Sequence, residues 1–273
     1  NLSDSLDTVT TYLARDKVFE NLIVQRSRSY AIESQKKEHG NTVSFPKRNK
    51  PIVADYSILS TYGSLLDMIE KAFNRADPLF NLVVYNPINF YLGDDEIDEF
   101  LRTRLRNVVT LIRTQFLKRF ESSVFAFETS CDRLLKKLIA FLKKHCETDD
   151  ELNRYDKWID DNEDILNYTR QQQLDLWGSD EDEEDPELFP QELLESWDTL
   201  SRDEYDVASI IDLTFNDLDE LVKFLKETRK FEPQKDDKLK KLIRLLKTKE
   251  FDNKKAIIFS EFADTARYIE RNL

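Results

Sequence analysis

Glycine is scarce in this sequence, and its scarcity excludes one class of nucleotide site. The chain of 273 residues has 4 glycines, which lie far apart at positions 40, 63, 93 and 178. A phosphate-binding loop needs closely spaced glycines ahead of a lysine, because only then can backbone N–H groups approach the phosphates. No glycine here precedes a lysine, and the acidic pair Asp95-Glu96 does not follow a buried strand that would present it to magnesium. We therefore expect that this chain does not hydrolyse ATP by itself.

Cysteine and histidine are also rare. Cys131 and Cys146 lie in helical patterns rather than at metal or disulfide spacing, so we predict two reduced thiols and a cytoplasmic location. His39 and His145 lie in unrelated contexts, and no nucleophile is paired with a base. We predict no catalytic residue, no metal site and no cofactor in this chain. No apolar run reaches the roughly 18 residues that would span a bilayer, which argues against a membrane partner.

The sequence is rich in the residues of long amphipathic helices. Hydrophobic residues make up 40% of the chain and charged residues 35%, and its 18 Phe are enough for a core. This composition, with little glycine or proline, predicts a mainly α fold with a few short strands. The longest periodic region is Arg102–Lys144, where Ser122 or Ser123 can cap a new helix at a break. Further along, Asp203–Ile211 and Asp217–Thr228 are predicted as separate helices.

Charge is distributed unevenly along the chain. The formal net charge is −13, yet the stretch Leu101–Cys146 holds eleven basic residues against three acidic ones. Local charge governs affinity for phosphates, so this stretch remains compatible with nucleic acid. Residues 147–230 are acidic by contrast. Their centre, Ser179–Glu187, reads SDEDEEDPE and is predicted to be a solvated, mobile loop.

The stretch Lys254–Leu273 has the pattern of a strand followed by a helix. Ala256–Phe259 is a continuous apolar run, which predicts a strand buried on both faces, as in a parallel sheet. Ser260 is a suitable N-cap, with acidic residues in the first turn that follows. The predicted inward face of the helix is Phe262, Ala266, Ile269 and Leu273. Because a parallel strand needs neighbouring strands, we interpret the chain as a piece of a larger protein, cut just inside an α/β domain.

The turn in this stretch resembles a known family. The sequence Phe259-Ser260-Glu261-Phe262, with Thr265 after it, resembles the first conserved strand and turn of the second RecA-like lobe in Swi/Snf-type ATPases. These proteins are superfamily-two helicase relatives that translocate on duplex DNA. Glu261 stands where the family more often has Gln, and a carboxylate there disfavours a direct phosphate contact.

Three other stretches resemble the same family, in the same order along the chain. The most specific, Leu117-Lys118-Arg119-Phe120-Glu121-Ser122-Ser123, resembles the Leu-x-Lys-Arg-Leu-Glu-Ser-Ser signature of its bacterial members. The block Gln25–Arg28, followed by Phe45–Arg48, resembles the arginine-rich block and Pro-Lys element after the first ATPase lobe. Lys235–Leu239 resembles the Lys-Asp-x-Lys-Leu element that leads into the second lobe.

The resemblance implies an organisation and a function. It implies that residues 1–50 follow the first ATPase lobe, that residues 51–230 form a helical protrusion, and that residues 231–273 begin the second RecA-like lobe. The whole protein would then be an ATP-dependent helicase or translocase that uses ATP and magnesium on double-stranded DNA. Arg26, Arg28, Lys118 and Arg119 would contact phosphates or the neighbouring lobe, with Arg119 the strongest candidate.

Other interpretations stay open. Arg26 and Arg28 are equally compatible with solvent-exposed charge at a strand end, and Lys118 and Arg119 with a solvated helix junction. The chain is also compatible with a helical protein-interaction module whose acidic segment docks a basic partner. A complete small enzyme is disfavoured, because no catalytic constellation is present.

Overall fold

A computed structural model describes residues 28–39, 49–74, 78–94, 98–177, 200–249, 251 and 254–273. The chain divides into two units, residues 1–53 and 54–273. The first unit contains one described helix, α3 (Arg28–His39). The acidic loop predicted at Ser179–Glu187 lies outside the described residues.

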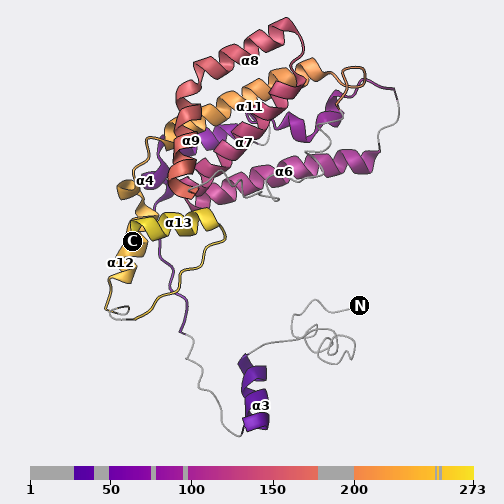
Figure 1. Ribbon diagram of the computed structural model, residues 1–273. Coiled ribbons are helices and arrows are strands. Elements are labelled where there is room, and N and C mark those ends of the chain that lie inside the picture. The colour runs from indigo at the N-terminus through magenta and orange to yellow at the C-terminus, as the bar shows by residue number, and fades with distance from the viewer. Residues whose placement is uncertain are drawn as a thin grey trace. The chain divides into compact units, whose positions relative to one another are not determined.

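The second unit is built from helices of very different lengths (Figure 1). The long ones are α6 (Glu99–Ser122), α7 (Val124–His145) and α11 (Val207–Thr228). The shorter α-helices are α4 (Ile58–Tyr62), α5 (Ser64–Ala72), α8 (Asp149–Asp161), α9 (Glu163–Trp177), α12 (Asp237–Leu246) and α13 (Ala263–Asn272). Single 3-10 turns lie at Val83–Tyr85, Pro87–Phe90 and Pro233–Lys235. The mainly α prediction is confirmed.

The core of this unit is centred on α7, which packs against α11 and α6. Aromatic rings from all three helices meet there. Phe127 of α7 lies edge-on to Phe224 of α11, with centroids 5.5 Å apart, and to Phe116 of α6, at 6.1 Å. Edge-to-face pairs of this kind add to the free energy gained by burying the rings.

The predicted break between two long helices is confirmed. Ser123 adopts an extended backbone conformation, and its Oγ accepts a hydrogen bond from the backbone N–H of Ala126 at 3.1 Å. This N-cap starts α7, while the N–H of Ser123 bonds to the carbonyl of Arg119 and ends α6. The serine therefore serves both helices at their junction.

Asp217 joins α11 to a distant turn. The predicted helices Asp203–Ile211 and Asp217–Thr228 merge into α11, which begins only at Val207, and Asp217 is buried in its middle. Its two carboxylate oxygens accept backbone N–H groups of Asn81 and Leu82 at 2.5 and 2.7 Å. Leu82 has a positive φ of 59°, so a strained turn is held by a buried carboxylate.

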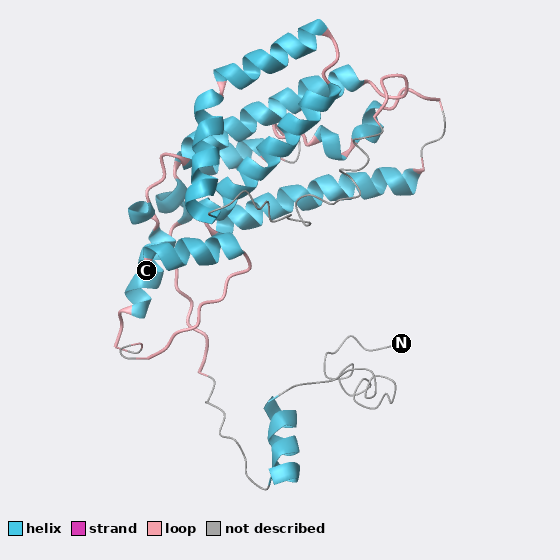
Figure 2. Cartoon of the chain, in the orientation of Figure 1, coloured by secondary structure: helices cyan, strands magenta, loops and turns pink. Residues whose placement is uncertain are grey.

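The predicted short strands are not formed in the described part of the chain (Figure 2). The β-pairing seen there is an isolated antiparallel bridge between Tyr91 and Tyr205. Residues 254–260 have no regular secondary structure, and Ile257 and Phe259 are 80% and 89% exposed. The strand expected at Ala256–Phe259 is not formed, because these residues make no β-pairing with another described segment.

The helix expected after that strand is present, with corrections to its start and to its face. It begins at Ala263 with Phe262 at the N-cap, and Ser260 Oγ accepts the N–H of Phe262 at 3.3 Å instead. The buried side chains on α13 are Asp264, Thr265 and Tyr268. Ala266 and Leu273, which were predicted to face inward, are exposed. None of the helices described is long and apolar enough to cross a bilayer.

A pH-dependent contribution to stability is expected from Glu128 of α7. Its Oε1 accepts a hydrogen bond from Tyr168 of α9 at 2.7 Å, and burial raises the pKa of Glu128 from 4.5 to about 7. The folded state then keeps a proton that the unfolded state releases, so stability falls as the pH rises through this window. Glu128→Gln retains the acceptor for Tyr168 and cannot titrate.

Urea unfolding of wild type and of Glu128→Gln at about pH 5 and about pH 8 checks this expectation. Between the lower and the higher pH, the free energy of unfolding of wild type should fall by about 1–3 kcal/mol relative to that of the variant. A difference that does not change with pH would contradict it.

Candidate functional site

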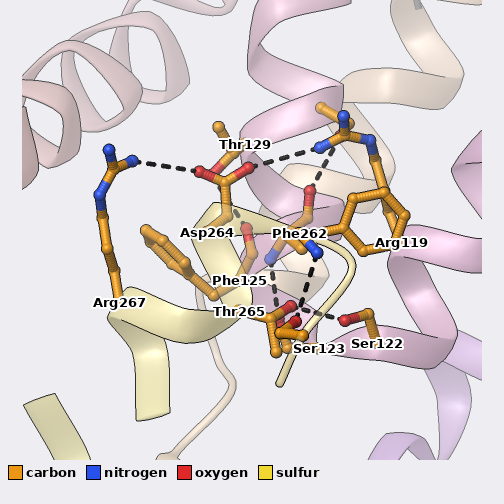
Figure 3. Close-up of polar contacts among 12 residues, drawn as sticks. Arg119, Ser122, Ser123, Phe125, Thr129, Phe262, Asp264, Thr265 and Arg267 are labelled. Atoms are coloured by element: carbon orange, nitrogen blue, oxygen red, sulfur yellow. Dashed lines mark hydrogen bonds and ion pairs between the residues drawn. The ribbon is translucent and has the colours of Figure 1, made fainter. Parts of the chain in front are cut away.

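The structure brings together two of the predicted groups of residues. Arg119, in the last turn of α6, lies beside Phe262 and Asp264 at the start of α13 (Figure 3). Lys118, one residue earlier, pairs with Glu261. We call this contact the α6–α13 joint. Its members are Lys118, Arg119, Ser122, Ser123, Glu261, Phe262, Asp264 and Thr265.

The two predicted arginines near the N-terminus lie elsewhere in the chain. Arg26 lies outside the described residues, as does Phe45–Arg48. Arg28 is the first residue of α3, is exposed, and belongs to the unit that precedes the helical core. Their predicted roles stay predictions.

Arg119 and Asp264 form a buried ion pair at the centre of the joint. Arg119 Nη1 lies 3.4 Å from Asp264 Oδ2, and the two side chains are only 7% and 5% exposed. The guanidinium also lies over the ring of Phe262, 4.6 Å from its centroid. Arg267 Nη1 lies 3.8 Å from the other oxygen of Asp264. In this conformation Arg119 faces α13, and a phosphate could reach it only if α13 moved away.

A cluster of three hydroxyl groups lies beside the ion pair. Thr265 Oγ1 is 2.7 Å from Ser122 Oγ and 2.9 Å from Ser123 Oγ. Because Ser123 Oγ already accepts the N–H of Ala126, its hydroxyl proton is available to Thr265. The N-cap of α7 and the first turn of α13 are thereby linked through one side chain.

An exposed ion pair lies at the rim of the joint. Lys118 Nζ is 3.2 Å from Glu261 Oε1, with 47% and 62% of the two side chains exposed. Pairs of this kind contribute little, because water and salt screen them. Lys118 is therefore the member of the joint that an outside anion can reach most easily.

Helix α12 is tied to the same junction. Lys238 Nζ donates to the carbonyl oxygens of Glu121 and Ser122, at 2.9 and 3.0 Å, which suits a cation at the C-terminus of α6. Tyr268 of α13 donates its hydroxyl to Asp236, at 2.9 Å, and Asp236 also caps α12 by accepting the N–H of Leu239. Burial raises the pKa of Tyr268, so this hydroxyl stays protonated. The end of α6, α12 and α13 thus form one connected group.

A cavity of about 560 Å³ opens between these elements. Phe259 and Ser260, the remaining predicted residues, line it together with Lys118, Phe262 and Thr265. Helix α12 contributes both apolar side chains, Leu242 and Leu245 among them, and the cation Lys241 to its lining. In the part of the chain that the structure describes, no group of three or more His, Cys, Asp or Glu side chains is arranged to hold a metal ion.

Sequence reasoning missed the partner of Arg119. Asp264 was noted only as an acid suited to the helix dipole, and Tyr268 was not considered. The available signal was their spacing, since Asp264 and Tyr268 are separated by four residues and share a helical face with Thr265. A purely hydrophobic criterion does not find this face, because two of its three members are polar.

Comparisons with protein-family models, with curated proteins and with solved structures found no match. The function is therefore argued from the residues themselves.

Removal of the buried carboxylate should release α13. Asp264→Ala leaves the Arg119 charge buried without its partner, a loss that costs about 3–5 kcal/mol at comparable sites. Because α13 lies at one end of the unit, we expect this loss as local opening, measured by faster amide hydrogen exchange over residues 263–272. Exchange in the C-terminal half of α7, away from its contact with α13, should not change.

Glu261→Ala is the matched control, since it removes a carboxylate from the exposed pair of the same joint. Its effect on the opening free energy of α13 should stay below about 1 kcal/mol. Equal effects of the two substitutions would contradict the central role of the buried pair.

A second substitution tests how much the hydroxyl cluster stabilises the position of α13. Thr265→Val keeps the shape of the side chain and removes the oxygen shared by Ser122 and Ser123, so α13 should open more readily by about 1–2 kcal/mol. Thr265→Ser retains the oxygen and should behave nearly as wild type in the same exchange measurement. A Val variant indistinguishable from the Ser variant would show that these hydrogen bonds contribute nothing.

Proposed function

We propose that this chain is the region between the two RecA-like lobes of a Swi/Snf-type, DNA-dependent ATPase, together with the start of the second lobe. The proposal rests on the four resembling stretches. In this assignment residues 51–230 are the helical protrusion and residues 231–273 begin the second lobe. Residues 256–259 become a strand of that lobe once neighbouring strands lie beside them. The rest of the motor supplies the site for ATP and magnesium.

The observation that best supports this proposal is the α6–α13 joint. Its two halves are the Lys118–Ser123 signature and the Phe259–Thr265 turn, which were identified separately and lie 143 residues apart at Ser122 and Thr265. Contact between them gives both signatures a common physical role. A movement of the second lobe would be passed directly to the end of α6 and the start of α7.

The joint also refines the role proposed for Arg119. With its guanidinium buried against Asp264, Arg119 acts as the contact between the protrusion and the second lobe. Exposed basic residues of α6 are then better placed for DNA phosphates. They are Arg102, Arg104, Arg106 and Lys118.

The alternative of a protein-interaction module depends on the acidic segment, which lies outside the described residues. No structural observation favours that alternative.

Binding of duplex DNA provides the test. The chain should bind fluorescent duplexes of unrelated sequence with similar affinity, and anisotropy should show a steep loss of affinity between about 50 and about 200 mM salt. With a net charge of −13, the chain as a whole repels DNA, so binding requires a local basic surface. Absence of binding at the lower salt concentration, or binding that salt does not weaken, would overturn the proposal.

A further inference from the structure

Helix α12 has one face made almost entirely of cations. Lys240, Lys241, Arg244 and Lys247 recur at helical spacing, and Lys241, Arg244 and Lys247 are exposed. The opposite face is apolar and turned toward the protein, with Leu239 buried and Leu242, Ile243 and Leu246 partly buried. Exposed Lys249, Lys254 and Lys255 follow the helix. These residues form what we call the α12 basic face.

The cations of this face are not used inside the described part of the chain. Within those residues, none of the seven takes part in an ion pair. The acidic residue on the same side, Asp237, is engaged elsewhere, because its carboxylate accepts the backbone N–H of Ser57 at 2.8 Å. Among the described residues, the face therefore presents positive charge to solvent without an acidic partner.

The helix that carries this charge is held firmly at its N-terminal end. Buried Asp236 caps it and receives the hydroxyl of Tyr268, while Lys238 bonds to two carbonyls at the end of α6. A row of cations on an anchored helix loses less entropy on binding than the same charges on a mobile segment.

We propose that the α12 basic face contacts the phosphate backbone of duplex DNA. The inference rests on the proposed function and adds to it a surface outside the basic stretch Leu101–Cys146. On a helix, the Cβ atoms of residues three or four positions apart lie about 5–6 Å from one another. Cations at this spacing form a regular row, which suits the regular row of phosphates on a DNA strand. Such contacts bind without reading sequence.

The composition of the face favours DNA over an acidic protein. Protein interfaces are anchored by a few large side chains, Trp and Tyr prominent among them, that enter pockets on the partner. Lys240, Lys241, Arg244 and Lys247 include no aromatic residue. Binding by charge alone suits phosphates.

The test compares two triple variants that lose the same charge. One is Lys240→Gln, Arg244→Gln and Lys247→Gln on α12. The matched control is Lys157→Gln, Arg170→Gln and Lys226→Gln, which removes two lysines and one arginine from exposed positions on α8, α9 and α11. Glutamine preserves helix propensity, and circular dichroism with thermal unfolding verifies that both variants fold.

The expected readout is the salt dependence of duplex binding. Each lost phosphate contact lowers the slope of log affinity against log salt by about 0.9, so the α12 variant should lose roughly 2–3 units of slope and the control almost none. Affinity at about 50 mM salt should fall at least tenfold for the α12 variant alone.

Three results would overturn the inference. If wild type binds duplex DNA and the α12 variant matches the control, the face is not a DNA surface, although the proposed function stands. If the α12 variant loses binding to polyglutamate but keeps duplex binding, the face serves an acidic protein instead. If wild type binds no duplex at any salt concentration, both this inference and the proposed function fail.

Discussion

The buried pair of Arg119 and Asp264 is the constraint that fixes the C-terminal part of this protein. Removing two charges from water costs free energy. Their mutual attraction offsets this cost only if the two groups lie close together and have further polar partners. The ring of Phe262 and the second arginine, Arg267, complete that environment. Since Asp264 lies in the first turn of α13, the pair joins the start of this helix to the last turn of α6, while the helix itself packs against α7. The hydrogen bond from Tyr268 to Asp236 then attaches α12 to α13.

The two parts of the second unit are stabilised by different forces. The helices between residues 58 and 228 enclose an aromatic core in which Phe80, Phe116, Phe127 and Phe224 are almost wholly buried. On α12 and α13, by contrast, few large apolar side chains are buried, and Leu239, Phe262 and Tyr268 are the examples. Polar contacts depend on exact geometry and are lost together when they separate, whereas a packed core resists gradual displacement. A helical body with a detachable polar contact at one end suits a part that moves against its neighbour.

Much of the helical architecture could be predicted from the sequence. The period of the apolar residues in Arg102–Lys144 located two long helices, and the small hydroxyl side chains located the break between them. Prediction failed at Asp217, because a carboxylate inside a helix looks like a boundary unless its distant partners, the N–H groups of Asn81 and Leu82, are known. These partners lie about 135 residues away, and no local pattern connects them.

The candidate site was predicted in its residues but not in its arrangement. Lys118, Arg119, Phe262 and Thr265 were identified from short motifs that say nothing about which of them meet. The inward face assigned to the last helix was only partly right, since Phe262 is buried and Ile269 half-buried but Ala266 and Leu273 are exposed. The rule behind that assignment counts hydrophobic residues. On α13 the carboxylate of Asp264 faces inward and pairs with Arg119. The hydroxyl of Thr265 also faces inward and hydrogen-bonds with Ser122 and Ser123. Long-range polar complementarity of this kind becomes visible only in three dimensions.

The extended residues 256–259 have one more consequence. They make no β-pairing, and the side chains of Ile257 and Phe259 are largely exposed, so these residues form an unpaired edge with high β-propensity. Any polypeptide that aligns with this edge gains hydrogen bonds and buries two large apolar groups at once. In concentrated solution the same edge invites adhesion between molecules, and a charged substitution at Ile257 would be the simplest safeguard of solubility.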